Sequence, residues 1–258
     1  MIEKKVTKML NEERKRKILE LTNLKGSISI NDLMKELGAS ESTVRRDLID
    51  MDSEGLIKKV HGGAVALKEG IMTRDLMVAQ RQDENKSEKE AIARYSAELI
   101  KDDDIVYLDA GTTTYMMIPY LKNTRATFVT NGVSHAMGLS MQGHHVYVPG
   151  GILKKETEAI IGQKAAEFIS EMNFTLGFFG TNGISFDEGF STPDIEEGMI
   201  KQKAFEKSRE RYILSDSSKF DKICSFSFGN YKDGIIITTS NIKEKYRNSR
   251  NTLLVDKL

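Results

Sequence analysis

The chain has 258 residues, of which 39% are hydrophobic and 29% charged, and its formal net charge is zero. This composition is typical of a folded globular protein, excludes disorder over most of the length, and indicates no particular partner by charge. A single cysteine, Cys224, excludes an intrachain disulfide, and the sequence shows neither a secretory signal nor the about 20 apolar residues of a membrane span, so we expect a cytoplasmic protein without membrane contact.

Charge and pattern divide the chain into parts. Residues 1–68 carry a net charge of +3 and the remainder −3, a sign that suits a DNA-binding unit on an acidic partner domain. Residues 1–68 are dense in helical patterns, residues 69–86 have no clear period, and residues 87–258 alternate strand-like and helical stretches. We therefore predict two domains, 1–68 and 87–258, joined by a linker over 69–86.

The first domain begins with two predicted helices. In the first, Ile18, Leu21 and Leu24 place apolar groups on one face. The second covers Ile30 to Leu37 and ends at Gly38, which permits a tight bend.

A third helix is predicted from Glu41 to Ser53, with Ser40 as its N-cap and Gly55 after its end. Apolar residues recur there at i, i+4 and i+7 and form a buried stripe of Val44, Leu48 and Met51. The opposite face carries Arg46, with Arg45 near the boundary.

Two short strands follow, around a predicted turn at Gly62 and Gly63. The second and third helices, joined by a tight turn and followed by a hairpin, make a winged helix-turn-helix. The third helix of this domain fits the major groove of DNA. The hairpin supplies Lys58, Lys59 and His61 for the flanking DNA backbone. The alternative is a small helical domain with surface arginines and no DNA function.

The second domain contains strand-like runs that each end in a small or polar loop, at residues 105–114, 127–132, 146–151, 175–184, 212–220 and 234–239. Helical stretches lie between them, such as Lys86 to Ile100 and Glu196 to Glu210. This alternation predicts an α/β fold with a mostly parallel sheet covered on both faces. Ligands of such sheets bind at the carboxyl ends of the strands.

The strongest candidate site is the loop from Asp109 to Thr114. Gly111 permits close approach of a ligand, and Thr112, Thr113 and Thr114 offer hydroxyl and amide groups that suit a phosphate. The loop has neither dinucleotide nor triphosphate spacing, so no cofactor is predicted. A threonine-rich helix cap without a ligand is the alternative.

Other strand ends add candidates. Lys219 is placed to attract a phosphate, and Asp216 to accept a hydrogen bond from a sugar hydroxyl or to cap its loop. Ordinary turn chemistry explains the remaining strand-end candidates equally well: Thr130, Asn131, Gly151 and the Gly180–Asn182 segment.

Two further patterns suggest structural roles. Glu197 and Lys201 stand at i, i+4, a spacing that predicts an ion pair on one helix. His135, His144 and His145 have no partners at metal-ligand spacing, so no metal site is predicted.

Longer motifs carry a resemblance to a known family. GASESTVRRDL at residues 38–48 and EGLIKKVHGGA at residues 54–64 resemble the N-terminal signature of the DeoR family of bacterial regulators. In that family the segment matching Ser40–Leu48 is the recognition helix. The resemblance therefore implies DNA contacts from Ser42, Thr43, Arg45 and Arg46.

The resemblance continues through the second domain, in DAGTTT, VTNG, PGG, Gly162, FGTNGI, STPDIEEGMIK and LSDSSKF. It implies a sensor similar in fold to ribose-5-phosphate isomerase that binds a phosphorylated sugar and then relieves repression. The phosphate would lie at Gly111–Thr114, Asp216 and Lys219 would contact the sugar phosphate, and Lys89 would be an accessory response residue. The motifs most resemble fructose operon repressors, which implies fructose 1-phosphate. One departure is Thr175, where the family usually has an aspartate.

We therefore expect a homo-oligomeric repressor, a dimer or tetramer, that binds operator DNA and is not an enzyme. The competing hypothesis is a sugar-phosphate isomerase with a DNA-binding appendage. It would use Asp109, Glu197 or Asp216 as the general base.

Overall fold

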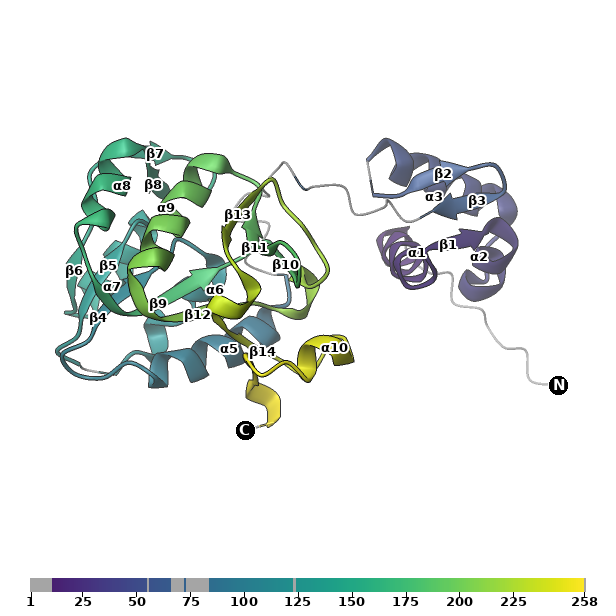
Figure 1. The fold of residues 1–258 in the computed structure, drawn as a ribbon. Coiled ribbons are helices and arrows are strands. Elements are labelled where there is room, and N and C mark those ends of the chain that lie inside the picture. Colours follow the sequence, from purple (N-terminus) through teal and green to yellow (C-terminus); the bar gives the residue numbers. More distant parts are fainter. Residues whose placement is uncertain (1–10, 55, 66–71, 73–83, 123, 258) are drawn as a thin grey trace. The chain divides into compact units, whose positions relative to one another are not determined.

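The computed structural model describes residues 11–54, 56–65, 72, 84–122 and 124–257. The chain forms two compact units, Met1–Gly70 and Ile71–Leu258, which we call the head and the body (Figure 1). Of the predicted linker 69–86, all but residues 72 and 84–86 lies outside the described residues. Within the described ranges, no helix is both long and apolar enough to span a bilayer.

The head contains three helices and a small sheet among its described residues (Figure 1). The elements are α1 (Asn11–Lys25), β1 (Ser27–Ser29), α2 (Ile30–Leu37), α3 (Glu41–Ser53), β2 (Lys58–Val60) and β3 (Gly63–Val65). The sheet is antiparallel in the order β1-β3-β2. The predictions of α2 and α3 are confirmed, whereas β1 was not predicted.

The core of the head is built by the predicted stripe of α3. Val44, Leu48 and Met51 are fully buried with Ile18 of α1 and Leu33 of α2. Gly38 takes the left-handed conformation (φ 59°) that the bend after α2 requires.

The predicted buried face of α1 was wrong at Leu24, which is 80% exposed. Thr22, four residues after Ile18, occupies the buried face instead, and its hydroxyl donates to the Ile18 carbonyl at 2.6 Å. That internal hydrogen bond lets a polar side chain stand where the pattern favoured an apolar one. The predicted helix end at Gly55 lies outside the described residues.

An ion pair joins α3 to α1. Asp47, on the inner face of α3, is buried, and its two carboxylate oxygens accept hydrogen bonds from Arg14 Nε at 2.5 Å and Nη2 at 3.0 Å. A two-point contact of this kind fixes orientation as well as distance. It therefore holds the outer face of α3 toward solvent.

The body is built on a seven-stranded sheet in the order β15-β14-β12-β9-β4-β5-β6, in which every neighbouring pair is parallel. The strands are β4 (Ile105–Leu108), β5 (Thr127–Thr130), β6 (His145–Tyr147), β9 (Phe174–Gly180), β12 (Ser208–Leu214), β14 (Ile235–Thr238) and β15 (Thr252–Leu254). The predicted parallel α/β sheet is confirmed, and only β15 had not been predicted among its strands.

Helices cover both faces of this sheet, each over its own apolar cluster. One face packs against α8 (Gln163–Ser170) and α9 (Ile195–Lys207), and the other against α5 (Lys86–Glu98) and α7 (Val133–Met141). The helix predicted over Glu196–Glu210 is shorter, because strand β12 begins at Ser208.

Smaller elements complete the body around this sheet. A three-stranded antiparallel sheet contains β10 (Gly183–Ser185), β11 (Gly189–Thr192) and β13 (Phe226–Gly229). A hairpin pairs β7 (Ile152–Lys154) with β8 (Ala159–Ile161). The short helices are α6 (Thr112–Tyr115), η1 (Ile118–Tyr120), η2 (Ser217–Lys219), η3 (Tyr231–Asp233), α10 (Glu244–Arg247) and η4 (Val255–Lys257).

Candidate functional sites

The outer face of α3 presents the side chains predicted to contact DNA. Ser42, Arg45 and Arg46 are exposed, and Thr43 is half-buried. Arg45 pairs with Glu41 one turn earlier at 2.6 Å, with both side chains about half exposed, so solvent screens the pair and a phosphate can replace Glu41. Contact of these residues with DNA stays a prediction.

The beginning of α3 differs from the expected cap. Ser40 stands at the N-cap position, but its hydroxyl hydrogen-bonds to the hydroxyls of Ser42 (3.1 Å) and Thr43 (2.9 Å) and makes no side-chain cap bond. Its backbone carbonyl accepts from the amides of Thr43 and Val44. The three hydroxyls therefore form one polar cluster at the beginning of α3.

The hairpin of β2 and β3, which we call the wing, carries Lys58, Lys59 and His61, and all three side chains are exposed. Its turn lies at His61 and Gly62, one residue earlier than predicted, because Gly63 already belongs to β3. A Cβ at Gly63 would lie 2.2 Å from the Ile28 carbonyl oxygen, so only glycine allows β1 to pair so closely. The Lys59 amide donates to Asp52 at 2.7 Å and ties the wing to α3.

A cavity lies in the body where strands β4, β9 and β12 end. It brings together six of the residues predicted for the effector: Lys89, Gly111, Thr112, Thr113, Asp216 and Lys219. It also contains the Gly180–Asn182 segment, a strand-end candidate that turn chemistry explained equally well, and residues that were not predicted to contact the effector, among them Glu197, Lys201 and Ser215. Three lysines and two carboxylates thus converge from both faces of the sheet.

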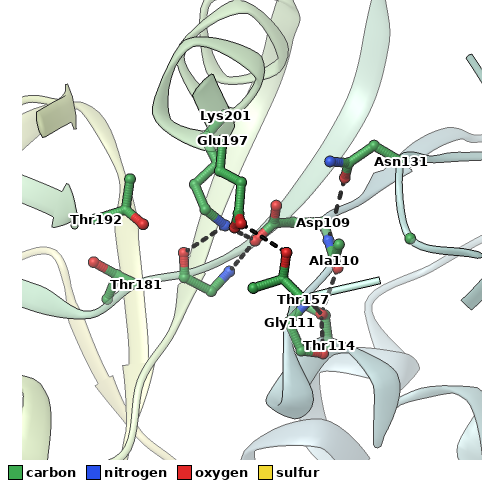
Figure 2. Close-up of polar contacts among 12 residues, drawn as sticks. Asp109, Ala110, Gly111, Thr114, Asn131, Thr157, Thr181, Thr192, Glu197 and Lys201 are labelled. Carbon is green, nitrogen blue, oxygen red and sulfur yellow. Dashed lines mark hydrogen bonds and ion pairs between the residues drawn. The ribbon is translucent and has the colours of Figure 1, made fainter. Parts of the chain in front are cut away.

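Two predicted residues lie beside the cavity and hold its loop. Thr114 is buried, and its hydroxyl donates to the carbonyl of Asp109 (2.6 Å) or Gly111 (2.8 Å) and accepts from the Gly111 amide (3.0 Å). Asn131 is buried, and its carbonyl oxygen accepts from the Tyr107 hydroxyl at 3.0 Å. The same oxygen accepts from the Ala110 amide at 3.3 Å (Figure 2). Both side chains shape the loop from within.

Two more predicted residues are absent from the described lining. Thr130 is buried and accepts a hydrogen bond from the Gly132 amide at 3.1 Å. Gly151 packs against β8, since a Cβ there would lie 2.5 Å from the Ile161 carbonyl oxygen. Their effector-binding role stays a prediction.

A buried ion pair forms the floor of the cavity. Lys201 Nζ binds the Asp109 carboxylate, which also accepts from the Gly180 amide at 3.0 Å (Figure 2). Both charged side chains are at least 93% buried. Asp109 therefore anchors α9 to the ends of β4 and β9, where a buried charge has to be paired.

The predicted Glu197–Lys201 ion pair was wrong, because both residues have partners from other elements. Glu197 binds Lys154 of β7 at 2.7 Å and the Thr157 hydroxyl at 2.7 Å. Lys154 also contacts Asp194 at 2.7 Å. The STPDIEEGMIK motif marked this segment in the sequence, but its side-chain partners lie far away along the chain.

Asp216 lies at the end of β12, beside Lys219. Its Oδ1 accepts from Asn85 (2.8 Å) and from the amide (3.0 Å) and hydroxyl (2.5 Å) of Ser218. Burial raises the pKa of Asp216, but the Lys219 charge and these hydrogen bonds outweigh it, so the pKa lies below its usual value. Asp216 is therefore an ionised carboxylate at neutral pH.

His135 lies under the Asp109–Thr114 loop, where its Nε2 is 3.0 Å from the Gly111 carbonyl oxygen. Burial lowers the pKa of His135 to about 4; the Gly111 contact and Glu158 oppose the shift and Lys201 reinforces it. The ring is thus neutral at physiological pH and acts as a support for the loop.

Thr175, where the family usually has an aspartate, lies at the start of β9 and away from the cavity. Its hydroxyl donates to Asp104 at 2.7 Å and accepts from the Ile105 amide at 3.1 Å. It therefore joins β9 to β4 at the amino ends of the strands, where it has no contact with the cavity lining.

Comparison with known proteins places this geometry in context. The DeoR-like helix-turn-helix domain matches residues 14–70, and the DeoR C terminal sensor domain matches residues 84–241. An uncharacterized HTH-type transcriptional regulator FruR of Bacillus subtilis is 38% identical, with 90% of this chain and 92% of the relative covered. A lactose phosphotransferase system repressor of Staphylococcus epidermidis is 31% identical, with 90% and 94% covered.

Similarity to solved structures is much weaker. Ribose 5-phosphate isomerase A of Methanocaldococcus jannaschii is 15% identical with a TM-score of 0.41, and 54% of this chain and 56% of that one are covered. A translation initiation factor eIF-2B of Pyrococcus horikoshii is 13% identical with a TM-score of 0.42, and 84% and 69% are covered. Values this low support no conclusion about ligand or activity.

Proposed function

Because the chain belongs to the DeoR family of transcriptional regulators, we propose that it represses a sugar-utilisation operon and leaves operator DNA when a phosphorylated sugar binds the body. The observation that carries the proposal is the cavity at the carboxyl edge of the sheet. It is small, polar and lined by three lysines, Lys89, Lys201 and Lys219. A phosphate needs cations and hydrogen-bond donors, and sugar hydroxyls need acceptors as well.

Fructose 1-phosphate is the favoured effector. The resemblance of GASESTVRRDL, DAGTTTYMMIPYL and GTNGIS to fructose operon repressors supports this choice. In the proposed mode, Thr112, Thr113 and Lys219 hold the phosphate, and Asp216 stays ionised to accept from a hydroxyl or to position Lys219.

DNA binding is assigned to the head. The exposed face of α3 carries Arg45 and Arg46, whose guanidinium groups suit guanine edges or phosphates in the major groove. Ser42 and Thr43 lie at the beginning of the same helix, and Lys58, Lys59 and His61 of the wing suit the flanking backbone.

Regulation is proposed to work through a homo-oligomer, a dimer or tetramer, because two heads on a symmetric assembly match repeated half-sites. The effector must bind more tightly to the conformation that releases DNA, since equal affinity for both states would shift nothing. The isomerase hypothesis is not retained, because relatives spanning nearly the whole chain are named transcriptional regulators and repressors.

A mobility-shift titration tests the proposal. Genomic fragments that bind the purified protein are selected, and fructose 1-phosphate, fructose and inorganic phosphate are then added. We expect a specific DNA complex that fructose 1-phosphate dissociates and free fructose does not. A complex that no sugar phosphate dissociates, with thermal stability equally unaffected by any of them, would contradict the effector assignment.

A further inference from the structure

Glu197 is the acidic residue that faces the cavity from the side of α9. It lies in the first turn of that helix, is 6% exposed and contributes to the cavity lining. The helix-stabilising partner expected from its spacing, Lys201, instead pairs with Asp109. A buried carboxylate at a ligand cavity, held by residues from another element, requires a separate explanation.

The two oxygens of Glu197 have different surroundings. Oε1 accepts two hydrogen bonds at 2.7 Å each, one from Lys154 Nζ and one from the Thr157 hydroxyl. Figure 2 shows the contact with Thr157. No residue in the described part of the chain donates a hydrogen bond to Oε2. Because a carboxylate oxygen can only accept, Oε2 leaves unused acceptor capacity at the cavity.

The charge around Glu197 decides what this oxygen accepts. Lys201 is matched by Asp109, and Lys154 is shared between Asp194 and Glu197. One lysine thus faces two carboxylates at this end of the cavity, which leaves an excess of negative charge. A phosphate dianion has no proton to donate and is repelled, whereas a neutral hydroxyl donates.

The other end of the cavity suits the phosphate. Lys219 on η2 lies there with Asp216, whose Oδ1 is already occupied by donors from Asn85 and Ser218. Thr112 and Thr113 add hydroxyls from the β4 loop. A ligand with a phosphate at one end and hydroxyls along its length therefore matches both ends at once.

We propose that Glu197 determines effector specificity: its Oε2 accepts a hydrogen bond from a sugar hydroxyl, while the phosphate binds toward Lys219. This inference rests on the proposed function, since it concerns the same sugar phosphate. The inference adds that a sugar hydroxyl, and not only the phosphate, determines which ligand binds. A site built to accept a hydrogen bond from a hydroxyl rejects an analogue without that hydroxyl. Lys154 and Thr157 are positioning residues that fix the orientation of the carboxylate.

The substitution Glu197→Gln tests this assignment at nearly constant shape. The Lys154 ammonium can only donate, so the amide oxygen takes the Oε1 position, where it also accepts from the Thr157 hydroxyl. The amide NH₂ then occupies the Oε2 position and offers a donor where an acceptor stood. We expect the Kd for fructose 1-phosphate to rise roughly 10- to 100-fold, as for loss of a hydrogen bond to a charged group.

Titration calorimetry on the full chain measures this change, with inorganic phosphate as the second ligand. Phosphate affinity is expected to be unchanged or higher in Glu197→Gln, because a repelling charge is gone. Glu196→Gln removes the same charge from an exposed neighbouring position and serves as the matched control, with no change expected for either ligand. Equal affinity of Glu197→Gln and the unmodified protein for fructose 1-phosphate would overturn the inference while the proposed function stands.

A second measurement begins with the unmodified protein, so its first result does not depend on the folding of a variant. The unmodified protein is titrated with monodeoxy analogues of fructose 1-phosphate. One analogue is expected to lose affinity by a similar factor, and Glu197→Gln is expected not to discriminate against that analogue. Uniform binding of all analogues would overturn the inference alone, whereas no binding of any sugar phosphate would overturn the proposed function and this inference together.

Discussion

The head and the body of this protein use their basic side chains in opposite ways. On α3, Arg45 is half exposed, its one ion-pair partner among the described residues is Glu41 on the same helix, and Arg46 is exposed. In the body, Lys89 and Lys201 are at most 5% exposed, and Lys201 is paired with a carboxylate 92 residues away in sequence. Exposed charge in the head is available to a partner, whereas buried charge in the body also holds the fold.

This difference separates stability from binding. An exposed arginine contributes little to folding, because solvent already satisfies it. A buried lysine whose removal leaves a carboxylate unpaired affects folding first and ligand binding second. Substitutions in the two units are therefore expected to give opposite results in unfolding and in binding assays.

The largest effect is expected for Lys201→Met, which leaves Asp109 buried without its cation. The free energy of unfolding of the body should fall by about 3–5 kcal/mol, as for other broken buried pairs. Urea denaturation at neutral pH measures the loss. Lys203→Met, which removes an exposed lysine two residues away, should change it by less than about 0.5 kcal/mol. A similar loss in both variants would show that the Lys201–Asp109 pair has no special role.

Acid is expected to destabilise the body through His135. Its pKa falls from 6.5 to about 4 on folding, so the unfolded chain binds more protons between these values. The stability that neutral His135 contributes is therefore fully present above about pH 6.5 and is lost as the pH falls toward 4. Between pH 7 and pH 5 the loss should be about 2 kcal/mol.

Unfolding free energies at pH 7 and pH 5 test this expectation with His135→Gln, which should have a flatter pH dependence than the unmodified protein. His145→Gln, an exposed position, is the control and should leave the pH dependence unchanged. An unchanged pH slope in His135→Gln would contradict the assignment.

Local rules predicted much of the head from its sequence. The bounds of α2 and α3 followed from apolar spacing, from Gly38 and from Ser40, all of which act within a few residues. Strand β1 was missed because three residues have no period of their own, and they form a strand only because β3 pairs with them. Leu24 was misplaced because Thr22 satisfies its hydroxyl inside the helix.

The candidate site was predictable only in part, for a different reason. The strand-end rule selected Gly111, Asp216 and Lys219, and one cavity contains all three, while their contact with an effector stays a prediction. Thr114 and Asn131 belong to the same motifs yet hold the loop from behind, and residue type does not distinguish the two roles. The partners of Lys201 come from remote segments, which no spacing rule within one helix reveals.

An intermediate effect is expected for Arg46→Ala, the opposite case to Lys201. Operator binding should weaken by about 1–3 kcal/mol, and unfolding should change by less than about 0.5 kcal/mol. Mobility-shift titration and urea denaturation measure the two quantities. Arg125→Ala removes an equally charged and 74% exposed side chain from the body and should leave DNA binding intact. Equal loss in both variants would mean that overall charge, and not the α3 face, governs binding.

The smallest effect is expected for Lys219→Met. Lys219 is partly exposed, like the arginines of the head, but it lines the cavity of the body. Asp216 keeps its donors from Asn85 and Ser218 when Lys219 is replaced. The loss of Lys219 should therefore lower the free energy of unfolding by less than about 1 kcal/mol. Without its charge, the fructose 1-phosphate concentration that releases operator DNA should rise about ten-fold, because a charge-assisted contact to phosphate is lost. DNA affinity without effector should not change. Lys232→Met, an exposed lysine outside the described cavity lining, is the control. Normal release of the Lys219→Met complex would contradict the placement of the phosphate at Lys219.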